Sequence, residues 1–447
     1  MLTQEQNEKL TRVGPGTPMG ELMRRYWHPV AAKAQLLERG VMPVRIFGED
    51  LVLFLDGQGR MGLVSDRCAH RLVKLDTAYT TDQGIRCPYH GWTYDVQGQC
   101  VDQPGEPAGS RFKDNVHLRS YPVQELAGLV FAYLGPLPAP LLPRWDRLVW
   151  DNVFRVICFI KIPCNWLQCM ENTPDPTHAT FLHGQFFKDW LRRNDIADER
   201  VHRLAEGFST PVIKHDYTVG KYGIDRRWLL EGQTGDNDVW SESLPLVFPD
   251  IHCTSGNGRH TFGWRLPIDD YNTMEVVIRA FEPGPGVEVP KQDPVPYCEI
   301  PMVDENGNYC ALQSVTGQDV MVWVAQGPIM DRTKELLGST DRGIVLYRRL
   351  LLEQMEKVQA GQDPINVFRD PAENQCLSLP VPGDRGNAWG IARDGSYVRG
   401  SATAADMIPQ HLKDEIEDLY VRAASARRRP EESTALERVA APSDTDN

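Results

Sequence analysis

Four residues on two short segments could hold a metal centre. Cys68 and His70 form the pattern C-x-H, and after sixteen intervening residues Cys87 and His90 form C-x-x-H. Thiolates and imidazoles bind either a structural zinc ion or a [2Fe–2S] cluster with two cysteines on one iron and two histidines on the other. Zinc fingers usually group cysteines with cysteines and histidines with histidines, whereas each segment here supplies one of each. The spacing therefore favours the cluster over zinc and over four unrelated core residues.

A second group of candidate ligands occurs in the run NWLQCMENTPDPTHATFLHG. Asp175 and His178 are three residues apart and share a helix face, but His178 and His183 are five apart and diverge by roughly 140° on an ideal α-helix. Both histidines can bind one ion only if the helix ends or is distorted, for which Pro174 and Pro176 supply a reason. Two histidines and a carboxylate suit an Fe(II) that activates O₂. Two structural histidines are the alternative.

The surrounding residues predict an α+β fold. Short strands separated by glycine and aspartate predict an all-β domain early in the chain, and alternating strands followed by amphipathic helices predict an antiparallel sheet with flanking helices later. The expected regions are an N-terminal helical segment (1–40), an all-β domain with the first ligand group (41–155), a catalytic domain with the second (156–424) and a mobile tail (425–447).

Charge and composition exclude several classes of function. The chain has 61 acidic and 48 basic residues, a net charge of −13, which disfavours nucleic acid as a partner. No signal peptide or membrane-spanning stretch is apparent, so we expect a cytoplasmic protein whose ten cysteines stay reduced. No G-x-G-x-x-G opens a helix after a strand. Electrons from NAD(P)H would therefore come through a separate reductase, a ferredoxin or both.

The first ligand group resembles a known signature. CAH followed by CPYHGW resembles the Rieske motif, and D-x-x-H-x-x-x-x-H downstream resembles the catalytic domain of Rieske non-haem iron oxygenase α-subunits. NWLQCMEN, THATFLHG, QGPIMDRT and LGSTDRGIVLYRRLLLEQ look like the phthalate dioxygenase branch, and within it the dehydrodivanillate O-demethylase type. The resemblance implies a Rieske [2Fe–2S] cluster on the first group. One departure is AHRLVKL after Cys68, where the family more often has a small, glycine-containing segment.

The resemblance also implies a mononuclear non-haem Fe(II) on His178, His183 and a distant aspartate, with O₂ as co-substrate. Asp319 in GQDVMVWVAQG fits the position of that aspartate. Asp331 and Asp341 compete with it, although either could be a helix N-terminal carboxylate. Asp175 matches the family residue that links the cluster of one subunit to the iron of its neighbour, which implies a homotrimer or a hexamer.

The implied function is that of a terminal oxygenase component acting on an aromatic acid. We expect O-demethylation of a methoxylated, lignin-type biaryl; ring dihydroxylation of the phthalate type and a non-catalytic Rieske electron carrier are the alternatives. Binding an acid requires a buried cation. Ser241 and Glu242 stand where a phthalate enzyme would be expected to have an arginine, which puts phthalate itself in doubt. The candidate cations are Arg226, Arg227, Arg265 and Arg279.

Overall fold

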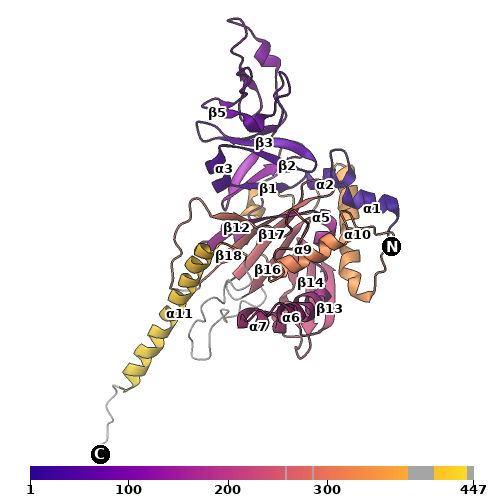
Figure 1. Cartoon of the computed structure of the whole chain (residues 1–447), viewed down its shortest axis with the longest axis vertical. Coiled ribbons are helices and arrows are strands. Elements are labelled where there is room, and N and C mark those ends of the chain that lie inside the picture. Colours follow the sequence, from indigo (N-terminus) through magenta and orange to yellow (C-terminus); the bar gives the residue numbers. More distant parts are fainter. Residues whose placement is uncertain (257–258, 284–285, 381–406, 440–447) are drawn as a thin grey trace, which may run out of the picture.

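The computed structural model describes residues 1–256, 259–283, 286–380 and 407–439. An all-β module lies at one end of the molecule, and a larger α+β part is built around one large sheet (Figure 1). This is the fold class that the sequence predicts. No helix in the described part of the chain is both long enough and apolar enough to cross a membrane.

Two four-stranded antiparallel sheets form the β-module. Phe54, Ile85 and Tyr94 are fully buried between them. The short 3-10 turns η1 (Leu75–Thr77) and η2 (Phe112–Asn115) lie in its connections. One sheet has the order β2 (Val41–Ile46), β3 (Glu49–Leu55), β4 (Met61–Ser65) and β9 (Ser120–Tyr121), and the other β5 (Tyr79–Thr81), β6 (Gly84–Arg86), β7 (Thr93–Tyr94) and β8 (Cys100–Asp102).

The N-terminal segment is only partly helical. The helices α1 (Gln4–Thr11), α2 (Pro18–Met23) and α3 (Lys33–Arg39) lie where the sequence predicts helix, but β1 (Trp27–Ala32) lies between α2 and α3. Pro29 cannot donate a helical hydrogen bond, and the buried WHPVAA run pairs with a strand instead. The resulting three-stranded sheet has the order β1, β11 (Leu129–Tyr133) and β10 (Val123–Leu126).

The large sheet has eight strands, all antiparallel to their neighbours except β19 beside β12. It forms because long runs such as RHTFGWRLP and TMEVVIRAF are rich in the aromatic and β-branched residues that favour strands. Its order is β13 (Val212–Val219), β14 (Gly223–Leu230), β15 (Leu244–Val247), β16 (Ile251–Gly256), β17 (Arg259–Pro267), β18 (Thr273–Phe281), β12 (Phe154–Ile162) and β19 (Tyr297–Glu299).

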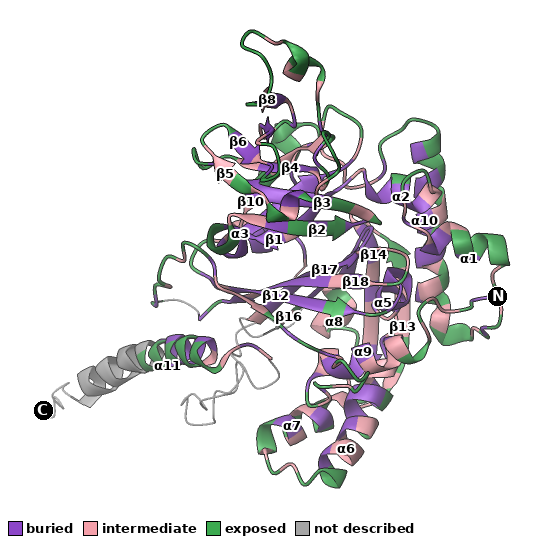
Figure 2. Ribbon diagram, turned by 45° about the horizontal axis from the view of Figure 1, so that its top comes forward, coloured by how far each residue is buried: buried purple, intermediate pink, exposed green. Residues whose placement is uncertain are grey.

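The two faces of the large sheet have different partners, and Figure 2 shows its central strands buried between them. On β17, Trp264 packs against Phe131 of β11, with ring centroids 5.6 Å apart. The adjacent Arg265 points to the opposite face, where its guanidinium carbon lies 4.4 Å from the Trp323 ring centroid. The helices of this second face include α5 (Trp166–Glu171), α9 (Val315–Ala325) and α10 (Arg342–Gln359).

The remaining elements connect or extend these layers. The C-terminal helix α11 (Gln410–Val439) continues past residue 424, where composition predicts the start of a tail, because Ala, Arg and Glu are strong helix formers. Residues 440–447 of the expected tail lie outside the described residues. The other short elements are α4 (Asp146–Val149), α6 (Phe187–Arg193), α7 (Glu199–Phe208), α8 (Asp238–Glu242), η4 (Ser339–Asp341) and η5 (Pro371–Asn374).

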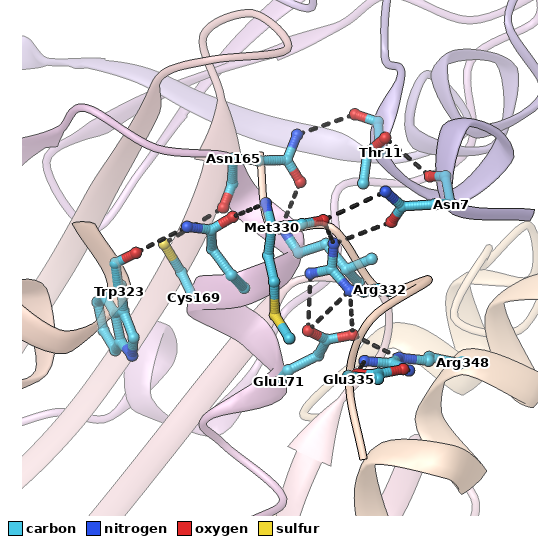
Figure 3. A network of polar contacts seen from close by, with 12 residues as sticks. Asn7, Thr11, Asn165, Cys169, Glu171, Trp323, Met330, Arg332, Glu335 and Arg348 are labelled. Atoms are coloured by element: carbon cyan, nitrogen blue, oxygen red, sulfur yellow. Dashed lines mark hydrogen bonds and ion pairs between the residues drawn. The ribbon is translucent and has the colours of Figure 1, made fainter. Parts of the chain in front are cut away.

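A buried charge cluster joins α5 to α10 and to the segment after α9 (Figure 3). The Glu171 carboxylate lies 2.7 Å from Arg332 Nη2 and 2.5 Å from Arg348 Nε, and Arg348 also pairs with Glu335. Asn7 of α1 accepts a hydrogen bond from Arg332 at 3.2 Å. All four charged side chains are at most 7% exposed. Buried charges are tolerated only when paired, so the cluster fixes how these elements meet.

We expect Glu171→Gln to lower the free energy of unfolding by about 3–5 kcal/mol, because Arg332 loses its carboxylate and Arg348 keeps only one. Urea denaturation followed by tryptophan fluorescence measures the loss. The matched control is Glu353→Gln, which breaks an exposed pair with Arg349 on α10 and should cost no more than about 0.5 kcal/mol. Equal effects of the two variants would show that the buried cluster does not hold the elements together.

Candidate metal centres

The first ligand group lies on two tight turns at the tip of the β-module. Cys68 and His70 lie in the turn after β4. A hydrogen bond from the Leu72 N–H to the Cys68 carbonyl at 2.9 Å closes the backbone of this turn. Cys87 and His90 lie between β6 and β7, where Cys87 N–H donates to the Trp92 carbonyl at 2.9 Å. The structure brings all four predicted residues to one place, with the His70 and His90 ring centroids 4.5 Å apart.

The four side chains are arranged with sulfur inside and imidazole outside. Cys68 and Cys87 are 1% and 2% exposed, whereas His70 and His90 are exposed. The Tyr94 hydroxyl accepts a hydrogen bond from the Ala69 N–H at 3.1 Å and lies 3.2 Å from Cys68 Sγ. The Tyr94 oxygen accepts the Ala69 N–H, and the Tyr94 hydroxyl proton can be donated to the Cys68 sulfur. A thiolate at this position would be stabilised by the hydrogen bond.

The spacing of these donors fits a two-iron cluster better than a zinc ion. A tetrahedral zinc site needs all four donors around one point. Among the described residues, one group of at least three His, Cys, Asp or Glu side chains has its ligand atoms within 4.8 Å of one another, and it includes none of these four. The turns therefore do not close on a single ion. Two thiolates on one side and two imidazoles on the other match the donor set of a Rieske cluster.

The group that does converge is His178, His183 and Asp319. His183 Nε2 lies 3.2 Å from Asp319 Oδ1, and His178 Nε2 lies 3.7 Å from the same oxygen. Asp319 is in α9, whose N-cap is Ser314. The structure thus brings together three residues that the sequence and the resemblance single out. Two imidazoles and a carboxylate form the facial set that non-haem Fe(II) oxygenases use.

A π-helical segment places the two histidines on one side. η3 (Ala179–Phe186) follows His178 directly and contains His183. Hydrogen bonds in a π-helix join residues five apart, so side chains at that spacing lie near the same face. The sequence predicts a helix end or distortion here, and the structure shows the distortion. The ring centroids of the two histidines are 5.2 Å apart.

The two competing aspartates lie elsewhere. Asp331 is exposed, accepts hydrogen bonds from Thr333 and forms an ion pair with Lys334. Asp341 accepts a hydrogen bond from the Gly338 N–H and precedes α10 as its N-cap residue. Both carboxylates are therefore engaged in local turns: Asp331 lies outside any helix, and Asp341 precedes α10 without capping it through its side chain.

Two amides at this group were given no role by sequence reasoning. Gln318 is fully buried and its Oε1 lies 2.9 Å from His183 Nδ1, while its Nε2 donates to the Leu312 carbonyl. In the neutral form of His183 this contact favours the proton on Nδ1, which leaves the Nε2 lone pair for a metal. Asn172 Nδ2 donates to Asp319 Oδ1 at 3.2 Å and lies 3.3 Å from His178 Nε2. The only sequence signal for either is its place beside a ligand.

The carboxylates of this region are held in their ionised form. Burial raises the pKa of Asp319, but the charges of His183 and His178 outweigh burial and keep this pKa below its ordinary value. The same holds for Asp175: burial raises its pKa, but the hydrogen bond and charge of His178 outweigh burial and keep this pKa below its ordinary value. Asp175 Oδ2 lies 3.6 Å from His178 Nδ1, and its side chain is 24% exposed. It therefore connects a candidate ligand to the surface.

The four candidate cations have structural partners. Arg226 and Arg265 are buried; Arg226 donates to the carbonyls of Thr173 and Leu244, and Arg265 donates to Thr173 Oγ1 and pairs with Glu275. These two are therefore buried and support the segment before His178. The other two arginines contact neighbouring strands: Arg227 donates to Thr218 of β13, and Arg279 donates to Thr261 of β17.

A large groove lies apart from the iron-type ligands. A groove of about 760 Å³ lies between β2 of the β-module and the large sheet, with Phe159, Leu266 and Val276 in its wall. Leu266 follows Arg265 on β17 and so faces away from α5 and α9. None of the three converging ligands lines this groove, so it lies outside their site.

Comparisons with known proteins identify two matching family models and several relatives. Residues 26–122 match the family model of the Rieske [2Fe-2S] domain, and residues 297–378 match that of the LigXa C-terminal domain like family. The chain is 39% identical to the 5,5'-dehydrodivanillate O-demethylase oxygenase subunit of a Sphingobium species over 85% of this chain and 87% of that one. It is 32% identical to the phthalate 4,5-dioxygenase oxygenase subunit of Pseudomonas putida, over 85% and 92%.

Solved structures share the fold. The oxygenase–ferredoxin complex of carbazole 1,9a-dioxygenase in its reduced form matches with a TM-score of 0.53 at 18% identity, over 84% of this chain and 98% of that chain. At this identity the likeness concerns the architecture alone.

We expect His183→Ala and Asp319→Ala to lose one iron per chain and keep the cluster. Iron should fall from about three to about two per chain, while acid-labile sulfide stays at about two per chain. Asp331→Ala and Asp341→Ala are the controls and should keep all three irons. Full iron content in Asp319→Ala, or loss of iron in either control, would show that the ligand is misassigned.

Proposed function

The chain belongs to the Rieske non-haem iron oxygenases, and we propose that it is an O-demethylase that acts on a methoxylated aromatic acid of the lignin-type biaryl class. Members of the family are oxygenase components that carry a Rieske [2Fe–2S] cluster and a mononuclear iron and use O₂. The 39% identity to an O-demethylase subunit over 85% of the chain carries the proposal. The 32% identity to a phthalate dioxygenase subunit is lower over the same share of the chain.

In this proposal the protein's own residues divide the work between two centres. Cys68, Cys87, His70 and His90 hold the cluster, and His178, His183 and Asp319 hold the iron. When bound, the cluster transfers single electrons and the iron activates O₂. Gln318 fixes the tautomer of His183, and Asn172 keeps Asp319 Oδ1 oriented through its hydrogen bond. The convergence of three iron-type ligands disfavours a non-catalytic electron carrier, which would not need them.

The overall reaction balances with two electrons from NAD(P)H. One oxygen atom of O₂ is inserted into a C–H bond of the O–CH₃ group, and the other leaves as water with two protons and two electrons. The hemiacetal product then breaks its C–O bond to release formaldehyde and a phenol. Pocket geometry decides whether a methyl group or a ring edge is oxidised. Ring dihydroxylation by a phthalate-type route is thus the second candidate, which the 32% identity to a phthalate dioxygenase subunit supports.

The substrate class also follows from what the chain has where a phthalate enzyme would have an anchor. Ser241 and Glu242 lie on the short helix α8, and no cation stands at these positions. Ser241 is exposed and donates to the Asp238 carbonyl at 3.4 Å. The absence of an arginine from these two described positions supports a substrate other than phthalate.

Electrons reach the cluster from a separate protein in this proposal. The related carbazole oxygenase is known in complex with a ferredoxin, and we assign a comparable donor, a ferredoxin or a NAD(P)H-dependent reductase, to this chain. The cytoplasm supplies the reduced nicotinamide that such a donor needs. The exposed histidine side of the cluster turns is the surface at which it can exchange electrons.

We further propose a homotrimer assembled head to tail. Figure 1 shows the β-module projecting from one end, on the other side of the large sheet from α9. Exposed apolar side chains, Leu72, Tyr89 and Phe112, surround the exposed histidines at 64%, 54% and 50% exposure. Such side chains favour docking on another surface. Asp175, beside His178 and 24% exposed, is the residue that a neighbouring cluster would meet.

We expect Asp175→Asn to fill both metal sites but to lose substrate turnover, because a neutral amide cannot link two imidazoles by charge. Single-turnover experiments with the pre-reduced protein measure whether cluster electrons are consumed. Asp331→Asn is the control because its exposed carboxylate lies away from both centres. A fully active monomer, or normal electron consumption in Asp175→Asn, would contradict the head-to-tail route.

We expect formaldehyde from methoxylated acids in the reconstituted system. The protein is supplied with a compatible reductase, NADH and O₂, and vanillate-like, biaryl and phthalate-like acids are compared. Formaldehyde should appear in a one-to-one ratio with NADH consumed, and His183→Ala should give none. The hydroxylated analogue of each acid, which lacks the methyl group, is the substrate control. Stoichiometric cis-diol without formaldehyde would overturn the demethylase assignment and leave the family assignment intact.

A further inference from the structure

The first cluster turn carries a feature that neither proposed metal centre explains. Its sequence continues from His70 as RLVK, and Leu72 has a left-handed backbone with φ of +59° although it is not glycine. Such a conformation costs about 1–3 kcal/mol for a residue of this type. Leu72 is 64% exposed, so burial of its side chain does not offset that cost. Strain of this kind persists where the surrounding geometry serves a purpose.

The turn uses this conformation to place Arg71 against the second cluster turn. Arg71 Nη1 donates to the Tyr89 hydroxyl at 3.2 Å, and the guanidinium carbon lies 5.5 Å from the Tyr89 ring centroid. Tyr89 precedes His90, and the centroids of these two rings are 3.8 Å apart. Arg71 itself follows His70. One cation is therefore held beside both histidines by a contact that spans the two turns.

Arg71 differs from every other arginine of the β-module in having no carboxylate partner. No carboxylate lies within 4.0 Å of it among residues 41–126, all of which the structure describes, or elsewhere in the described chain. The six other arginines in that range each have one. Their pairs are Arg45–Asp50 at 2.6 Å, Arg60–Asp56 at 2.7 Å, Arg67–Asp66 at 3.5 Å, Arg86–Asp102 at 2.7 Å, Arg111–Asp114 at 2.8 Å and Arg119–Glu49 at 3.4 Å.

We propose that Arg71, held in place by Tyr89, is a positioning residue that raises the reduction potential of the cluster by setting an uncompensated positive charge beside its histidine side. Reduction adds one electron, supplied by the separate donor, and makes the cluster one unit more negative. A nearby cation stabilises the reduced form more than the oxidised form. No bond or proton changes at Arg71. The proposal concerns the cluster alone and holds whatever the substrate is.

The side of the cluster matters for this effect. The cysteines are buried, and the buried Tyr94 hydroxyl already contacts the Cys68 sulfur. The histidine side faces water, which weakens the field of any charge placed there. An exposed arginine with a carboxylate partner would add almost no net charge. Fixing Arg71 on the Tyr89 ring and hydroxyl keeps the charge close without neutralising it.

The test is a redox titration of the full-length holoprotein followed by the cluster's electron paramagnetic resonance signal, at low and at high salt. Arg71→Gln should shift the midpoint potential downward, more at low than at high salt, because an exposed charge is screened. Arg71→Lys should keep most of the potential. Tyr89→Phe removes the hydroxyl that holds the guanidinium and should give a smaller downward shift.

Two further variants distinguish this effect from a structural one. Tyr94→Phe removes a buried hydrogen bond near Cys68 and should lower the potential equally at both salt concentrations. Arg45→Gln makes the same change of net charge on β2, where Arg45 pairs with Asp50 and Asp269 rather than with a cluster turn, and should leave the potential unchanged. Iron and sulfide content establishes that each variant holds its cluster.

An unchanged potential in cluster-loaded Arg71→Gln at low salt would overturn the proposal. A shift of equal size at low and high salt would also overturn it, since that is the signature of altered cluster structure. Should Arg71→Gln fail to take up its cluster, Tyr89→Phe decides against the wild type. Its potential should lie below that of the wild type at low salt and approach it at high salt, and no difference at low salt would refute the role of Arg71.

Discussion

The iron-type site depends on the buried carboxylate of Glu171, which must be paired with cations. Glu171 ends α5 in the interior, and burying an unpaired carboxylate costs several kcal/mol. Its two guanidiniums come from different parts of the chain, Arg332 from the segment after α9 and Arg348 from α10. The next residue is Asn172, which contacts both His178 and Asp319. Pairing at Glu171 therefore determines where that amide meets the ligands that the π-helical segment and α9 supply.

The same need for partners connects the sheet to this site. Arg265 of β17 satisfies Glu275 on one side and Thr173 on the other, and Arg226 of β14 donates to the Thr173 carbonyl. Thr173 lies between α5 and the irregular turn with Pro174. Neither arginine is available to bind a substrate because the guanidinium groups of both already form hydrogen bonds to Thr173. Support of the ligand-bearing segment thus comes from the face of the sheet that packs against α5 and α9.

Sequence reasoning succeeds where chemistry is local and fails where it depends on packing. The cluster residues are readable because each turn must bring one thiol and one imidazole to the same centre, and the five-residue gap from His178 to His183 requires an irregular helix. The form of the irregularity, a π-helix, is set by contacts over the whole segment. Gln318 and Asn172 show no pattern of their own, since an amide beside a ligand has no periodic signal.

The fold shows the same division. Alternating apolar residues identify the strands of the large sheet, and amphipathic spacing identifies α10. The strand β1 is missed because WHPVAA lies in a stretch of helical spacing and becomes a strand only by pairing with β11, about a hundred residues later. Which of the four candidate arginines are buried cannot be read from the sequence for a related reason: only the tertiary partners decide whether a strand arginine is solvated.

The two surfaces through which electrons would pass carry opposite charge. At the cluster tip Arg71 has no carboxylate partner, while the surface beside the iron ligands presents Asp175 with a pKa held below its ordinary value. The chain as a whole has a net charge of −13, so copies repel one another at long range. Within a Debye length, about 8 Å at physiological ionic strength, local charges dominate over this repulsion. In the head-to-tail assembly proposed above, docking of tip on neighbour is therefore favoured over tip on tip, because only the first contact brings opposite charges together.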